Sequence, residues 1–148
     1  MTRGSGSILI DHPLDPANRE LQHGFVESDE HKNIYDGIVT LDANGEAVVE
    51  FPDWFEVVNT DFRYQLTCVG GYAPVCIAET IADQTMTIAG GQPGLQVSWQ
   101  VTGIRHDPYA LDHPIIPDKP KPEGAVGTYY YAGEYGGPAY GGPLSGED

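Results

Sequence analysis

The chain has 148 residues, of which 40% are apolar, enough for the core of one ordinary domain but not for two full-sized cores. Its 22 acidic and 7 basic residues give a formal net charge of -15, which excludes the cationic surface that binds nucleic acid or an anionic membrane. No apolar run approaches the roughly 20 residues of a membrane span, and the first residues lack the apolar segment of a signal peptide.

A change in composition near Arg105 predicts three regions. We expect an N-terminal extended connector over residues 1–33, a β-sandwich body over 34–104 and a Pro/Gly/Tyr-rich C-terminal arm over 105–148. The prolines of the first region predict extended backbone over residues 11–18. The last 44 residues hold 7 of the 12 prolines, 8 of the 19 glycines and 6 of the 9 tyrosines, without the aliphatic periodicity of a core. The arm is therefore not expected to fold alone.

In chain order, the first strong pattern after the connector is a pair of strands around a tight turn. Residues 34–41 and 46–51 flank Asp42-Ala43-Asn44-Gly45, in which Asn-Gly supplies the positive φ angles of a two-residue turn. This arrangement predicts a β-hairpin. Residues 53–58 then predict a single helical turn that carries Trp54 and Phe55, with Asp53 as its cap.

Further strands are predicted by the alternation of apolar and polar residues. The alternation is clear over residues 62–68 and 95–102, and a weaker pair spans 75–80 and 84–89 around Ala82-Asp83. Within 95–102, Trp99 lies on the apolar side and is predicted to belong to the core. About seven short strands predict an all-β fold, either a compact antiparallel β-sandwich or a small barrel, followed by a long C-terminal extension.

Catalytic and metal-binding patterns are missing from the sequence. The histidines show neither the i, i+4 spacing of helical zinc sites nor a Cys-x-x-Cys partner, and we interpret them as surface residues. No Gly-x-Ser-x-Gly nucleophile motif occurs. We therefore predict no enzyme activity, no catalytic residue, no metal site and no cofactor. A hydrolase based on two buried carboxylates stays a third hypothesis, because acidic residues are abundant.

The two cysteines, Cys68 and Cys76, are separated by a seven-residue loop. Facing strand positions would bring the two sulfurs into bonding range, and a disulfide would then stabilise the fold by about 2 to 3 kcal/mol. Two buried free thiols fit the sequence equally well.

The arm carries a cluster of tyrosines: Tyr129, Tyr130, Tyr131, Tyr135 and Tyr140. Tyrosines among glycines are typical of adaptable recognition loops, because each ring offers a large contact area and a polar tip. Such a surface would suit a glycan or a protein receptor. Two alternatives are a disordered tail and an arm that lies across a neighbouring subunit.

Residues 36–55 resemble the hairpin of phage tail-fibre tip domains, with the pattern G-x-V-T-L-D-x-x-G-x-A-x-V-x-[FL]-P-x-x-F. Residues 97–103 are similar to the closing V-x-W-x-x-x-G strand of the same domains, so the resemblance covers residues 35–103. Residues 10–18 and 61–67 further resemble the C-terminal module of large bacterial repeat-rich surface proteins. The resemblance implies a homotrimeric, β-rich tip or cap at the end of a long shaft, and it brings no catalytic residues. The cysteines and the Gly/Tyr/Pro extension depart from it.

These observations favour a non-enzymatic structural and assembly module that forms a homotrimer, with the arm on neighbouring copies. A filament is the alternative assembly, because an extended arm can also make heterologous contacts that propagate from copy to copy without closing into a ring. A rival hypothesis is a tip domain that binds a glycan or receptor through its tyrosines. In each case we expect the chain to work outside the cell, on a cell surface or on a virion, as part of a larger protein.

Overall fold

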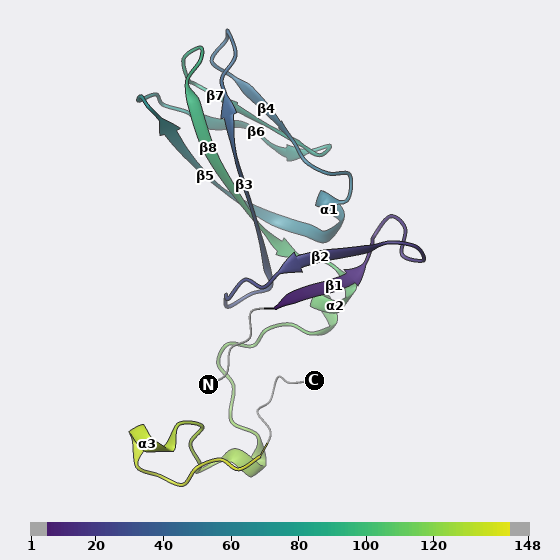
Figure 1. The fold of residues 1–148 in the computed structure, drawn as a ribbon, viewed down its shortest axis with the longest axis vertical. Coiled ribbons are helices and arrows are strands. Elements are labelled where there is room, and N and C mark those ends of the chain that lie inside the picture. The colour runs from purple at the N-terminus through teal and green to yellow at the C-terminus, as the bar shows by residue number, and fades with distance from the viewer. Residues whose placement is uncertain (1–5, 143–148) are drawn as a thin grey trace. The chain divides into compact units, whose positions relative to one another are not determined.

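The computed structural model describes residues 6–142, and the chain divides into two compact units, Met1–Ile115 and Ile116–Asp148. Among the described residues, the first unit is built mainly of strands (Figure 1). The strands are β1 Ser7–Asp11, β2 Glu20–Gly24, β3 Lys32–Thr40, β4 Ala47–Glu50, β5 Asn59–Val69, β6 Cys76–Ala82, β7 Thr85–Ala89 and β8 Gln96–Arg105. Two short helices accompany them, α1 Phe55–Val58 and α2 Pro108–Asp112.

The strands form three antiparallel sheets, with the orders β3-β8-β5, β4-β7-β6 and β1-β2. Side chains from both three-stranded sheets, together with Leu41 and the helix α1, contribute to one hydrophobic core. Its buried members are Leu41, Val49, Phe55, Ile81, Met86, Ile88, Val97 and Val101. The prediction of an all-β fold is confirmed, and in the described part of the chain no sheet closes into a barrel.

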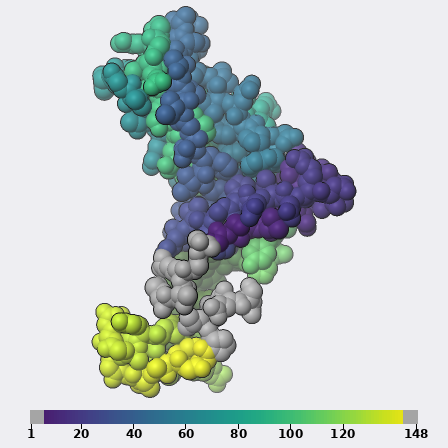
Figure 2. All heavy atoms as spheres, in the orientation of Figure 1, coloured from purple at the N-terminus to yellow at the C-terminus, as the bar shows by residue number. Residues whose placement is uncertain are grey.

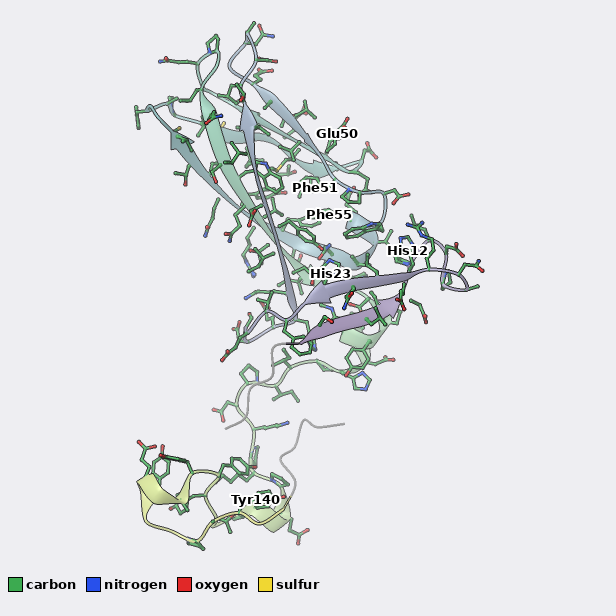
Figure 3. All side chains as sticks on the ribbon, viewed as in Figure 1. His12, His23, Glu50, Phe51, Phe55 and Tyr140 are labelled. Atoms are coloured by element: carbon green, nitrogen blue, oxygen red, sulfur yellow. The ribbon has the colours of Figure 1, made fainter. Side chains whose placement is uncertain are left out.

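The central strand β8 follows the predicted alternation. Val97 and Val101 are fully buried, whereas Gln96 is exposed. Trp99, on the same side as the two valines, is partly buried and packs against the core. Phe51 and Phe55 lie between the two sheets (Figure 3), and their rings stack with centroids 4.2 Å apart. The alternation therefore places one face of β8 in the core.

The predicted hairpin of residues 34–41 and 46–51 is wrong in its pairing. Strand β3 pairs with β8, and β4 pairs with β7, so the two strands belong to different sheets. The turn between them is present: the Asp42 side chain accepts hydrogen bonds from the backbone N–H of Asn44 and Glu46, at 2.8 and 3.1 Å. Only Gly45 has a positive φ, 74°, and an added Cβ there would collide with the Gly91 carbonyl. A turn with one left-handed residue, packed against a second loop, passes the chain from one sheet to the other.

The weaker predicted pair is confirmed as the antiparallel strands β6 and β7. Their turn has positive φ angles at Asp83 and Gln84, 51° and 62°, as the tight hairpin turn requires. The single helical turn is also confirmed as α1, but the predicted cap is wrong. Trp54 occupies the N-cap position, and no side chain caps the helix.

The segment expected to be an extended connector contains the hairpin β1-β2. Its loop is closed by hydrogen bonds from the His12 N–H to the Arg19 carbonyl, at 3.0 Å, and from the Arg19 N–H to the Asp15 carbonyl, also at 3.0 Å. The prolines of this segment lie in the loop, where they remove no donor from the strand ladder. In Figure 2 the hairpin, in purple, lies against the blue residues of the rest of the first unit.

The second unit contains short local structure. A 3-10 turn, η1, spans Glu123–Ala125, and the helix α3 spans Ala132–Tyr135. Tyr129 pairs with the segment around Ala139: its N–H donates to the Pro138 carbonyl at 2.9 Å, and its carbonyl accepts from the Tyr140 N–H at 3.0 Å. These contacts close residues 129–140 into a loop.

Candidate functional sites

The structure brings four of the predicted tyrosines into two ring pairs. Tyr129 and Tyr135 stack with their centroids 5.4 Å apart, and Tyr130 and Tyr140 meet edge to face at the same separation. Figure 3 labels Tyr140 within this loop. Tyr131 belongs to neither of these pairs. Because the backbone contacts around residue 129 close the loop, the rings are held in a defined arrangement.

Lys121 joins the two ring pairs. Its ammonium lies 5.2 Å from the centroid of the Tyr129 ring and 5.0 Å from that of Tyr130, close enough for a cation–π interaction with each. The same ammonium donates a hydrogen bond to the Thr128 carbonyl. No pattern in the sequence predicts this contact, since Lys121 lies outside the tyrosine cluster.

The loop leaves its rings accessible. Tyr131 and Tyr135 are 67% and 65% exposed, and Tyr130 is 50% exposed. Aromatic rings that are held in position and exposed can stack on a flat apolar surface while their hydroxyl groups exchange hydrogen bonds. This is the chemistry of a contact surface for another molecule.

Both cysteines are free thiols in the structure. Cys68 is partly buried on β5, and its thiol donates to the Ala73 carbonyl at 3.5 Å. Cys76 is exposed at the first position of β6, in the other three-stranded sheet.

The interpretation of the histidines as surface residues is wrong for His12, which is 1% exposed. Figure 3 labels this residue at the loop end of the hairpin β1-β2. Its side chain folds back into the β1-β2 loop, where Nδ1 accepts the Leu14 N–H at 3.2 Å. Its Nε2 has no hydrogen-bond partner among the described residues. Local backbone geometry, which a search for ligand spacings does not detect, thus buries this ring.

A chain of polar side chains links the hairpin to the sheet β3-β8-β5. Asn33 donates to Asn59 at 2.9 Å, Asn59 donates to the Tyr35 hydroxyl at 2.9 Å, and that hydroxyl lies 3.0 Å from Nε2 of His23. Because the hydroxyl accepts from Asn59, its own proton is available for His23. Burial lowers the pKa of His23, and the positive charge of Arg105 lowers it further, against an opposing effect of Asp107. His23 is therefore neutral near pH 7, and its Nε2 accepts a hydrogen bond from the Tyr35 hydroxyl.

Beside these hydrogen-bonded side chains lies a buried ion pair that the sequence does not predict. Arg105, at the end of β8, donates from Nε and Nη2 to the two carboxylate oxygens of Asp107, each at 2.8 Å. The same carboxylate accepts from the Ala110 N–H at 3.3 Å and so caps α2. Arg105 and Asp107 are only 7% and 3% exposed. A single arginine at a strand end carries no pattern that would reveal its burial.

Within residues 6–142, no three His, Cys, Asp or Glu side chains lie close enough together to hold a metal ion. No helix in that range is both long and apolar enough to traverse a bilayer. Comparisons of this chain with models of known families, with curated proteins and with solved structures find no match.

Proposed function

We propose that this protein is a non-enzymatic structural and assembly module, a homotrimeric tip or cap similar to those of tail fibres. In this proposal the part of the C-terminal arm that follows the first unit, from residue 116 on, contacts neighbouring copies, because Arg105, Asp107 and Ala110 are buried in the first unit. The module would act outside the cell, on a cell or virion surface, as part of a larger protein. The sequence resemblance over residues 35–103 supports the tip or cap, and the antiparallel sheets of the first unit agree with the β-rich fold that the resemblance implies.

The proposed role of the arm rests on one observation, which is that its large apolar side chains are exposed to solvent. Ile116 and Val126 are 59% and 68% exposed, in addition to the tyrosine rings, and Leu111 and Ile115 are exposed before them. Burial against a second copy would remove this surface from water, at about 25 cal/mol per Å² of apolar area. Tyrosines are enriched in protein interfaces for this reason. Several side chains buried at once would offset the repulsion between chains of net charge -15.

A second candidate function is binding of a glycan or a receptor by the same loop. The two ring pairs around Lys121 favour it, because fixed and exposed aromatic faces suit the apolar faces of sugars. The two functions differ in what the tyrosines contact, a second copy or a foreign ligand.

Light scattering after size exclusion tests the assembly. We would compare the full chain with a version that ends at Ile115, which retains the whole first unit with α2. A trimer has a mass of about 48 kDa, three times the 16.0 kDa of one chain. A trimer that becomes a monomer on truncation supports the proposal. A full chain that is monomeric overturns the proposal. Species larger than a trimer that disappear on truncation indicate a filament instead of a closed trimer.

A tyrosine variant separates the two candidate functions. The double substitution Tyr131→Ser and Tyr135→Ser removes two exposed rings, and Tyr72→Ser is the matched control because Tyr72 is 88% exposed in the first unit. Loss of the trimer in the double variant alone supports assembly. Loss of a glycan-array signal with an intact trimer supports recognition.

A further inference from the structure

Strand β3 forms one edge of the sheet β3-β8-β5, because its partner in that sheet is β8 alone (Figure 1). Its register with β8 runs from Lys32 to Thr40 without a shift. Apart from this ladder, residues 34–40 make no backbone hydrogen bond in the part of the chain that the structure describes. At a free edge, every second residue points its N–H and C=O groups away from the sheet. These groups can pair with one more strand.

The other edges of the two three-stranded sheets are less suited to pairing. Strand β4 has only four residues, and the register of β6 with β7 shifts twice. Strand β5 has an irregularity between Thr60 and Arg63, and its exposed side chains from there to Thr67 are polar. Short strands, irregular register and charged side chains are the devices that protect sheet edges. Strand β3 therefore offers the longest uninterrupted edge of these two sheets.

The exposed side chains of β3 form a symmetrical row. Ile34 and Ile38 are 47% and 64% exposed, and the exposed Asp36 lies between them. Alternate residues of a strand share a face, so the row is apolar, acidic and apolar in turn. A strand that pairs with this edge places its own side chains beside these three. Because the row is the same in both directions, a parallel and an antiparallel strand meet the same pattern.

The charge of Asp36 determines which strand fits. Its neighbour across the ladder is the uncharged Gln100, and none of the ion pairs among residues 6–142 includes it. A second copy of β3 that paired Ile34 with Ile38 would also place Asp36 against Asp36, and like charges directly opposite each other destabilise a strand pair. A lysine or arginine at that position would form a cross-strand ion pair instead. The net charge of -15 also attracts a basic segment to the chain.

We propose that the free edge of β3 binds an extended segment of a partner protein, with a basic residue opposite Asp36 and apolar residues opposite Ile34 and Ile38. Backbone hydrogen bonds with residues 34–40 add the segment to the sheet, and the three side chains select the pattern apolar-x-basic-x-apolar. The inference does not rest on the proposed assembly, because β3 lies in the first unit and the arm contacts of that proposal begin after it.

Fluorescence anisotropy tests this binding when a labelled peptide, Thr-Ile-Thr-Lys-Thr-Ile-Thr, is titrated with the full chain. The matched peptide has glutamate in place of the lysine. We expect saturable binding of the lysine peptide, about tenfold tighter than that of the glutamate peptide, because repulsion from Asp36 replaces attraction. Failure of the lysine peptide to saturate, or equal affinity for both peptides, overturns the proposal.

An exchange of charge locates the site. Asp36→Lys should weaken binding of the lysine peptide about tenfold and should bind the glutamate peptide more tightly than the wild type does. That gain would also show that the variant is folded. Glu50→Lys is the matched control, because it changes the net charge equally at an exposed position of β4 and should retain the preference for lysine. Equal losses in the two variants would mean a general attraction to an acidic chain and would contradict the inference.

Two further measurements test whether the peptide joins the edge of β3. Ile38→Thr should weaken binding of the lysine peptide about threefold, whereas Val48→Thr, which replaces a 60% exposed residue of β4, should leave it unchanged. Bound peptide should also slow amide hydrogen exchange within residues 34–40, because the outward N–H groups gain acceptors. Slower exchange confined to other strands places the peptide elsewhere and refutes the assignment.

Discussion

Glu56 and Gln84, 28 residues apart in the sequence, each bind the backbone of the other. The Glu56 carboxylate accepts the Gln84 N–H at 2.7 Å, and the Gln84 side-chain oxygen accepts the Glu56 N–H at 3.2 Å. The Gln84 carbonyl also accepts the Phe51 N–H at 2.8 Å. This reciprocal pair attaches α1 to the turn between β6 and β7.

Substitution Glu56→Ala should lower the free energy of unfolding by about 1 to 3 kcal/mol, because it leaves the Gln84 N–H without its charged acceptor. Urea denaturation followed by circular dichroism measures the change. Glu50→Ala is the matched control, since Glu50 is exposed on β4 (Figure 3) and should have an effect close to zero. Equal effects of the two substitutions would show that the reciprocal contact contributes nothing.

Gly37 provides the space for Trp99. The two residues are paired across β3 and β8, and a Cβ on Gly37 would lie 2.7 Å from the indole ring. Gly37→Ala should therefore displace the ring and destabilise the fold by roughly 1 to 3 kcal/mol. Gly24→Ala is the control, because an added Cβ there meets no atom within 4 Å. Thermal denaturation compares the variants, and a Gly37→Ala variant as stable as the control would refute the packing argument.

The neutral state of His23 predicts a pH dependence of stability. Burial and the charge of Arg105 lower its pKa in the folded chain below the ordinary 6.5, so the unfolded chain binds more protons at acidic pH. The contribution of His23 is complete above about pH 6.5 and is lost as the pH falls from there through the folded pKa. The melting temperature of the wild type should accordingly fall between about pH 7 and about pH 5.

Substitution His23→Gln isolates this effect, because glutamine stays neutral at every pH and its side-chain oxygen can still accept a hydrogen bond from the Tyr35 hydroxyl. Its melting temperature should fall less between the same two pH values than that of the wild type. His106→Gln, which replaces an exposed histidine, should retain the dependence of the wild type. If His23→Gln and the wild type lose the same stability, His23 does not cause the pH dependence.

Features that depend on near neighbours along the chain could be predicted from the amino-acid sequence alone. Alternation along residues 95–102 and 62–68 predicted β8 and β5, and the pattern around Trp54 and Phe55 predicted one helical turn. A turn at residues 42–45 was also predicted, from Asn44-Gly45, although only Gly45 has a positive φ and the Asp42 carboxylate accepts the hydrogen bonds of the turn. Local sterics and local hydrogen bonds suffice for each of these features.

The pairing of the strands and the burial of polar groups, in contrast, depend on contacts between residues far apart in the chain. The turn at 42–45 is compatible with a hairpin, but burial of both apolar faces in one core places β3 and β4 in different sheets. The partners of Tyr35 lie 12 and 24 residues away in the sequence, in His23 and Asn59. Burial of Arg105 likewise depends on the packing of the hairpin against the sheet ends. Such contacts bring together residues with no common local pattern, so the three-dimensional fold determines both the hydrogen bonds of Tyr35 and the ion pair beside them.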